Sequence, residues 1–234
     1  MSVGTINLKI NGQDVASING DTILKAAKEH GINIPTLCEF DGLTSLGGCR
    51  LCLVEVKGSP KLFPACTTPV SNGMEVTTES DRLKLYRRMA LELILSERIH
   101  VCSVCVANNN CELQDLANKL GVDHVRFERN WKSRNVDSTH EFLVLDRNRC
   151  ILCSRCVKVC DQIEGVHVLD LKMRGKDSEI IVELDDTWGN SKSCTSCRKC
   201  AKVCPVGSIY VEGQPIILTR DKKIAEFVLE RRRK

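Results

Sequence analysis

Several features that commonly reveal a function are scarce or missing in this sequence of 234 residues. Aromatic residues make up only 4% of it, although they bring the largest buried area per side chain. We therefore expect several small modules, each held by something other than a large apolar core. No run approaches the roughly 18 apolar residues of a membrane span, since even the stretch 89–95 contains Glu92. The sequence thus predicts no membrane span.

Targeting signals are also missing. The first residues lack the basic segment, apolar run and cleavage site of a secretory signal, and a twin-arginine signal is absent. We therefore expect a cytoplasmic protein, in which thiols stay reduced and runs of cysteine bind metal rather than form disulfides. The formal charge is +4, but acidic and basic residues are interspersed and few aromatics are available to stack on bases. We expect no nucleic-acid partner.

Motifs for catalysis and nucleotide binding are missing as well. The sequence has no GxGxxG or GxxxxGK[ST] loop, no GxSxG elbow and no HExxH helix. Four of the five histidines are scattered, and the acidic pair Asp185 and Asp186, next to Trp188, is typical of a turn. We therefore expect no catalytic residue and no site for NAD or flavin in this chain.

Cysteine, in contrast, is abundant, with 15 residues. The cysteines fall into four groups, and a histidine precedes the second group. The groups are Cys38, Cys49, Cys52 and Cys66; Cys102, Cys105 and Cys111 with His100; Cys150, Cys153, Cys156 and Cys160; and Cys194, Cys197, Cys200 and Cys204. The 15 thiols and one imidazole make four sets of four ligands, with no cysteine left over.

The third and fourth groups form an internal repeat. Both have the spacing C-x2-C-x2-C-x3-C, and they align residue for residue at an offset of 44. This is the run of two-cluster bacterial ferredoxins, in which the fourth cysteine of each run binds the other cluster. We therefore expect one [4Fe-4S] cluster on Cys150, Cys153, Cys156 and Cys204, and a second on Cys194, Cys197, Cys200 and Cys160. Three thiolates at such spacing splay further apart than the compact tetrahedron of zinc requires and suit the corners of a cubane.

The second group of cysteines is compatible with two kinds of metal site. Cys102, Cys105 and Cys111 with His100 could hold a [4Fe-4S] cluster or a zinc ion bound by three thiolates and one imidazole. We favour the cluster, because three other clusters would surround it.

The first group resembles the plant-type [2Fe-2S] pattern, with a longer first gap. Its surroundings follow the order strand, hairpin, helix, cysteine loop and strands, which is typical of a β-grasp ferredoxin. Residues 6–10 alternate as a strand, Asn11-Gly12 is a hairpin turn, and Asp21 or Thr22 can cap a helix that ends at Gly31. Gly47 and Gly48 in the cysteine loop would let backbone amides approach the sulfides closely.

We predict an α+β protein of three modules. They are a β-grasp [2Fe-2S] domain over 1–79, a helical domain with the His/Cys3 cluster over 80–121, and a double [4Fe-4S] ferredoxin domain with a tail over 145–234. A connector over 122–144 joins the last two. Helices are expected from Ser80 to about Ile99 and from Glu112 to Gly121. Strands are expected at 53–56, 74–77 and 142–145, and in an insert between the last two cysteine runs (166–172 and 180–184).

Three segments of the sequence resemble one superfamily. They are PTLCEFDGLTSLGGCRLCLVEVKG with PACTTPV, HVCSVCVANNNCELQDLA, and RCILCSRCVKVC with SCTSCRKCAKVCPVGSI. Together they look like the N-terminal region of the large iron–sulfur subunit of respiratory complex I. They are more similar still to the electron-transfer subunit of the diaphorase half of Hox-type bidirectional NAD(P)-linked [NiFe] hydrogenases. The resemblance covers nearly the whole chain.

This resemblance implies an electron relay with one [2Fe-2S] and three [4Fe-4S] clusters and no substrate site of its own. Its partners would be a flavoprotein subunit that oxidises NAD(P)H and the small subunit of a hydrogenase, and through that the [NiFe] large subunit. The family places the clusters on the four ligand sets given above, with His100 in the second. Complex I homologues have His-x3-Cys there, whereas one residue separates His100 from Cys102. The alternative is a histidine that faces the helix dipole while another ligand completes the cluster.

Other interpretations make different predictions. A complex I large subunit or an [FeFe] hydrogenase would continue into further domains, and we expect neither because the sequence stops at Lys234. A relay subunit of a NAD-dependent formate dehydrogenase is the main alternative, since cluster ligands do not identify the destination of the electrons. A zinc-stabilised scaffold is the non-redox alternative, and it predicts zinc without labile sulfide. Because a relay has no substrate of its own, we expect a stable heteromeric complex.

Overall fold

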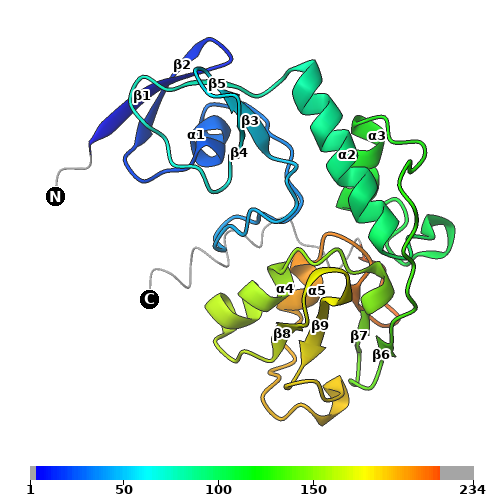
Figure 1. Cartoon of the computed structure of the whole chain (residues 1–234). Coiled ribbons are helices and arrows are strands. Elements are labelled where there is room, and N and C mark those ends of the chain that lie inside the picture. Colours follow the sequence, from blue (N-terminus) through cyan, green and yellow to red (C-terminus); the bar gives the residue numbers. More distant parts are fainter. Residues whose placement is uncertain (1–3, 217–234) are drawn as a thin grey trace.

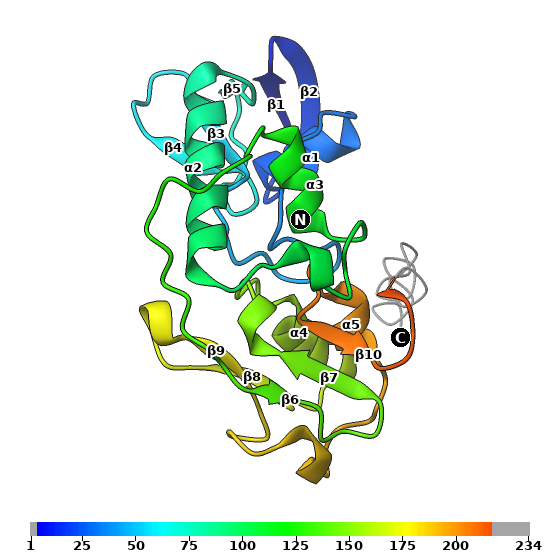
Figure 2. The same ribbon diagram turned by 90° about the vertical axis from the view of Figure 1, so that its right-hand side faces the viewer.

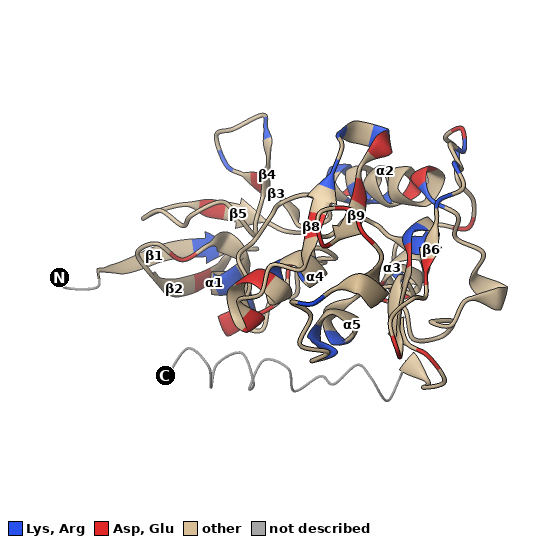
Figure 3. Ribbon diagram, turned by 90° about the horizontal axis from the view of Figure 1, so that it is seen from below, with Lys and Arg blue, Asp and Glu red and all other residues tan. Residues whose placement is uncertain are grey.

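The structure is a computed structural model that describes residues 4–216, so the terminal basic run 231–234 lies outside the described residues. Figure 1 shows three modules: a sheet with one helix, a pair of helices beside it, and a lower module of short strands and helices. This mixture of helix and sheet confirms the predicted α+β class. The charged side chains are also mixed, because Figure 3 shows Lys and Arg interspersed with Asp and Glu over the described ribbon.

The N-terminal module is a five-stranded sheet with the order β2-β1-β5-β3-β4. Its elements are β1 (Thr5–Ile10), β2 (Gln13–Ile18), α1 (Ile23–Glu29), β3 (Leu53–Val56), β4 (Leu62–Pro64) and β5 (Glu75–Thr77). Asn11 and Gly12 have φ of 53° and 82°, as the two central residues of a type I′ hairpin turn require. The Thr22 hydroxyl caps α1 by accepting a hydrogen bond from the Lys25 amide at 3.2 Å. The hairpin and the helix were both predicted, whereas β4 was not.

The second module consists of α2 (Asp81–Glu97), the 3-10 turn η1 (Cys102–Val104) and α3 (Glu112–Lys119). Ser80 caps α2, accepting a hydrogen bond from the Leu83 amide at 3.1 Å. Arg87 lies on the buried face of this helix. Its guanidinium is buried as well, and it donates to the carbonyls of Leu53 at 2.8 Å and Thr78 at 2.9 Å. This contact fastens α2 to the N-terminal sheet.

The third module contains a three-stranded sheet with the order β10-β7-β6 and a β8-β9 hairpin. Its elements are β6 (Val136–Asp137), β7 (Leu143–Asp146), η2 (Arg147–Arg149), α4 (Arg155–Lys158), the π-helical turn η3 (Val159–Glu164), β8 (Leu169–Lys172), η4 (Gly175–Asp177), β9 (Glu179–Val182), η5 (Trp188–Asn190), α5 (Lys199–Val203) and β10 (Ile209–Val211). The strands predicted near 142–145 and in the insert are present. β6 lies in the segment expected as a connector, yet it pairs with β7 of this sheet.

The three modules pack against one another. One buried apolar cluster runs through the second and third modules and includes Leu37, Leu43 and Leu51 from the first cysteine loop. Figure 2 shows this loop reaching from the N-terminal sheet toward α4 and α5. Lys158 and Gln162 hold it there, because Lys158 Nζ donates to the Thr44 carbonyl at 2.6 Å and Gln162 Nε2 to the Thr44 hydroxyl at 2.6 Å. Among residues 4–216, no helix is long and apolar enough to cross a membrane.

Candidate metal centres

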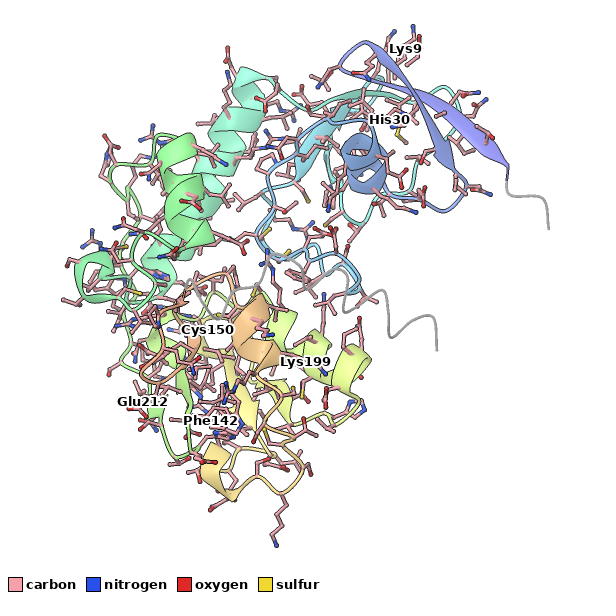
Figure 4. The ribbon with its side chains drawn as sticks, turned by 180° about the vertical axis from the view of Figure 1, so that it is seen from behind. Lys9, His30, Phe142, Cys150, Lys199 and Glu212 are labelled. Atoms are coloured by element: carbon pink, nitrogen blue, oxygen red, sulfur yellow. The ribbon has the colours of Figure 1, made fainter. Side chains whose placement is uncertain are left out.

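All 15 cysteines lie within the described residues, and none of them forms a disulfide. Cys102 and Cys197 are exposed, while the others are buried or half-buried. In the described part of the chain, no three His, Cys, Asp or Glu side chains converge on the position of a single metal ion. Figure 4 labels Cys150 near the place where the third module meets the other two.

The first cysteine set joins the loop before β3 to the residues that follow β4. The thiols of Cys52 and Cys66 lie 3.4 Å apart. A hydrogen bond from Cys49, opposed by burial, lowers the pKa of Cys38 to about 5. A hydrogen bond from Cys52 lowers the pKa of Cys66, opposed by burial and by the negative charges of Cys38 and Cys49. The four thiols therefore lie close enough to influence one another.

Backbone amides complete this first site. The Gly48 amide donates to Cys38 and the Gly47 amide to Cys66, and each bond lowers the pKa of the thiol it reaches. Gly47 has φ of 67°, a conformation that glycine adopts without steric cost. The two glycines thus let main-chain N–H groups reach ligand sulfurs, as the sequence indicated.

The second set lines a cavity of about 280 Å³. Cys102, Cys105, Cys111 and His100 all line it. The Nε2 atom of His100 is buried and has no hydrogen-bond partner among residues 4–216. Burial, helped by the nearby charge of Arg149, lowers the pKa of His100 to about 4. A neutral imidazole nitrogen without a partner, in a cavity lined by three thiols, fits the role of fourth ligand.

The third module closes this cavity. Gly207, three residues after Cys204, approaches Cys105 so closely that a Cβ atom there would lie 2.8 Å from the Cys105 sulfur. The Glu112 amide donates to the Pro205 carbonyl at 3.0 Å on the same side. A glycine at 207 is therefore needed for this close approach.

The third set takes its cysteines from both ferredoxin-like runs. Cys150, Cys153, Cys156 and Cys204 are all buried. Burial, followed by the charge of Cys204, raises the pKa of Cys150 to about 11. Burial and the charges of the three other thiols of this set raise the pKa of Cys156. The structure thus brings Cys204 close to the first run, although it lies 44 positions after Cys160.

The fourth set combines Cys160 of the first run with Cys194, Cys197 and Cys200 of the second. Burial raises the pKa of Cys200, and the charges of Cys197, Cys194 and Cys160 raise it further. The four thiols also line one cavity of about 20 Å³, together with Trp188. Cys160 thus lies near the thiols of the second run.

The repeat extends to the backbone. Leu152 and Ser154 have φ of 55° and 58°, and their equivalents Ser196 and Arg198 have φ of 54° and 61°. Left-handed residues turn successive N–H groups toward one centre, which favours bound negative charge. The Leu152 amide, for example, lies 3.4 Å from the Cys150 sulfur. Sequence analysis missed these positions because none of them is a glycine.

Two other residues at the sites were missed. The indole N–H of Trp188 donates to the Cys194 sulfur at 3.4 Å, although the sequence indicated only a turn there. Arg155 lies between Cys153 and Cys156 and binds both carboxylate oxygens of Glu112 at 2.8 Å. An arginine inside a ligand run was the available signal for the second residue. Altogether, four sets of four donors with amide N–H groups on their sulfurs fit iron–sulfur clusters.

Comparison with known families gives three consecutive matches. Residues 4–81 match a 2Fe-2S iron-sulfur cluster binding domain, residues 87–126 match the NADH-ubiquinone oxidoreductase-G iron-sulfur binding region, and residues 149–208 match a 4Fe-4S dicluster domain. The chain therefore contains one 2Fe-2S domain, followed by domains that bind 4Fe-4S clusters.

Similar proteins agree with this order. The gamma subunit of the NAD-reducing hydrogenase HoxS of Cupriavidus necator is 32% identical over 206 residues, which is 88% of this chain and 86% of that subunit. The alpha subunit of the NADPH-Fe(3+) oxidoreductase of Geobacter sulfurreducens is 34% identical over 95% of this chain, but the match spans only 26% of that subunit. A chain in the crystal structure of an NAD+-reducing [NiFe]-hydrogenase in the H2-reduced state superimposes with a TM-score of 0.84, at 31% identity over 91% of this chain and 89% of that one.

Proposed function

Since the chain belongs to the family of iron–sulfur subunits that includes the gamma subunit of the NAD-reducing hydrogenase HoxS, we propose that it relays electrons within an NAD(P)-linked hydrogenase. Its partners are a flavoprotein subunit that oxidises NAD(P)H and the small subunit of a [NiFe] hydrogenase. The complex catalyses H2 + NAD(P)+ = NAD(P)H + H+ in either direction. The observation that carries this proposal is the presence of four ligand sets in three interlocked modules.

We assign a [2Fe-2S] cluster to the first ligand set and [4Fe-4S] clusters to the other three. The sets are Cys38, Cys49, Cys52 and Cys66; His100, Cys102, Cys105 and Cys111; Cys150, Cys153, Cys156 and Cys204; and Cys160, Cys194, Cys197 and Cys200. Bound clusters of these kinds exchange single electrons at potentials between about −700 and +450 mV. The modules that carry them are 1–79, 80–121 and 145–234, with a connector over 122–144.

This chain contributes position and environment. Buried thiols such as Cys156 and Cys200 keep water from the sites, and backbone amides stabilise negative charge on the sulfurs. The hydrogen bonds of Lys158 and Gln162 to Thr44 fix the first site against the third module. We propose that this subunit is part of an oxidoreductase without holding a substrate, and that it works in the cytoplasm.

A second candidate is the same relay role in another NAD(P)-linked enzyme. The similarity to the alpha subunit of a NADPH-Fe(3+) oxidoreductase, which covers 95% of this chain, favours it. A NAD-dependent formate dehydrogenase belongs to this class of alternatives. In each case the chain would hold the same clusters, but its partner at the other end of the relay would be a different enzyme subunit.

The cluster content gives a direct prediction. Anaerobically purified protein should contain about 14 iron atoms per chain and as many acid-labile sulfides, because it holds one [2Fe-2S] and three [4Fe-4S] clusters. Elemental analysis and sulfide assay measure both. Zinc with no labile sulfide would instead establish the scaffold interpretation. About 10 iron atoms would mean that one [4Fe-4S] site is not formed.

The function itself is tested on the native complex. We expect an anaerobic pull-down of this chain to retain a flavoprotein and to reduce NAD(P)+ when H2 is supplied. Oxidation of NADH with an artificial acceptor but no response to H2 would exclude the hydrogenase and favour another donor such as formate. A free monomer without flavoprotein would contradict both candidates.

A further inference from the structure

Trp188 is among the largest fully buried side chains, with 1% of its surface exposed. It begins η5, in the insert that separates the two ferredoxin-like cysteine runs. Its indole N–H donates to the Cys194 sulfur at 3.4 Å, and its ring lines the cavity that the fourth cysteine set shares. A tryptophan N–H that is buried needs a partner, and here that partner is a ligand thiol.

The backbone of Trp188 is fixed by strand β6. The Trp188 amide donates to one carboxylate oxygen of Asp137 at 2.8 Å in a buried hydrogen bond. The Thr139 hydroxyl donates to the other oxygen at 2.6 Å and accepts from the Gly189 amide at 2.7 Å. A Cβ atom on Gly189 would lie 2.5 Å from the Thr139 carbonyl oxygen, so η5 packs directly against the segment that follows β6. The indole therefore has little freedom to leave the sulfur.

The ring itself is fixed by His140. The imidazole meets the indole edge-on, with centroids 5.6 Å apart, and meets Phe142 edge-on at 4.7 Å. Its Nδ1 accepts from the amides of Phe142 and Leu143, each at 3.2 Å. Nε2 is then the protonated nitrogen, and it lies 3.1 Å from the hydroxyl of Ser196 in the Cys194–Cys197 loop. Figure 4 labels Phe142 in the lower part of the third module, away from its contact with the other two.

A hydrogen bond to a ligand sulfur is stronger when the sulfur carries more negative charge. Reduction by one electron adds negative charge to the sulfurs, so the bond stabilises the reduced form more than the oxidised form. The buried setting increases this difference, because little water screens the charge. The hydrogen bonds and burial around a cluster are the usual means by which a protein sets its potential.

We propose that Trp188 raises the reduction potential of the cluster held by Cys160, Cys194, Cys197 and Cys200 by donating its indole N–H to the Cys194 sulfur. This inference rests on the proposed function, since it requires a cluster at that site. Trp188 is a positioning residue in this role, because it acts on the cluster through the ligand. The insert between the two runs thus tunes the ferredoxin-like site that contains Cys194.

The test is a Trp188→Phe variant of the intact complex, followed by a redox titration monitored by EPR. Phenylalanine keeps an aromatic side chain and removes the N–H. We expect the reduced-to-oxidised ratio of this one cluster, at fixed potential, to fall roughly tenfold, which is about 59 mV for one electron. The other clusters should keep their potentials. The matched control is Trp131→Phe, because Trp131 is 39% exposed and stacks on Arg129.

A second substitution controls for the fact that phenylalanine is smaller than tryptophan. Incorporation of benzothienylalanine at 188, in a Trp131→Phe background, replaces the indole N–H by sulfur in a ring of nearly the same size. It should give the same negative shift with full iron content. An unchanged potential in a variant that keeps its full iron content overturns the role of Trp188. Lack of iron at this cysteine set in the unmodified complex overturns the proposed function instead, so the two failures are distinguishable.

Discussion

Replacing Arg155 with methionine is expected to loosen the junction of the three modules and to lower the free energy of unfolding by about 3 kcal/mol. Arg155 is 3% exposed and binds the Glu112 carboxylate through two bonds of 2.8 Å. It also donates to the Val203 carbonyl at 3.4 Å and lies over the Phe40 ring at 5.5 Å. Each module therefore supplies a partner. Because the Glu112 side chain is 43% exposed and can be hydrated, we expect the lower end of the range for a broken buried pair.

Denaturant unfolding under anaerobic conditions, followed by circular dichroism and by visible absorbance, measures this loss. Burial alone would lower the pKa of Arg155, but the bonds to Glu112 raise it, so the guanidinium is charged at all working pH values. The control is Arg129→Met, since Arg129 is exposed and stacks on Trp131, and its effect should stay within about 0.5 kcal/mol. Equal unfolding midpoints for the two variants would show that the junction does not hold the modules.

Replacing His100 with alanine is expected to remove one [4Fe-4S] cluster, which is about four iron atoms per chain. His100 lines the cavity of Cys102, Cys105 and Cys111. Its buried Nε2 lacks a hydrogen-bond partner within the described range 4–216. Burial lowers the pKa of His100 to about 4, so the imidazole is neutral and its nitrogen is available to a metal near neutral pH. Iron and sulfide analysis together with the EPR spectrum of the reduced protein measures the loss.

Two further variants make this result specific. His124→Ala is the matched control, because His124 is exposed and pairs only locally with Asp123 at 2.8 Å. It should leave the iron content unchanged. His100→Cys should retain the iron and alter the EPR signal of this cluster, because a thiolate replaces an imidazole. If His100→Cys left both the iron content and the signal wholly unchanged, His100 would not be a ligand.

Elements governed by neighbouring residues could be predicted from the sequence. The hairpin at Asn11 and Gly12, the Thr22 cap and the Ser80 cap all depend on bonds within a few residues. β4 and β6 were missed because they have three and two residues. Such short strands carry no hydrophobic period and exist only through their pairing with β3 and β7.

The ligand sets likewise have features that could be predicted from the sequence and features that could not. The spacing of the two cysteine runs is local, and it was enough to predict that Cys204 would join the first run and Cys160 the second. The surroundings of the sulfurs are not local. Neither the indole N–H on Cys194 nor the approach of Gly207 to Cys105 has a signature in spacing or composition.

By itself, the sequence predicted four ligand sets in a fixed order, and it determined the family and the local elements around the cysteines. Only the tertiary structure decided how the three modules lock together, through Arg155 with Glu112 and Lys158 with Thr44, and which side chains contact the ligand sulfurs. The physical reason is that ligand spacing is set by the chain between neighbouring residues. Burial, charge and hydrogen bonding at sulfur instead depend on segments that meet only when the chain is folded.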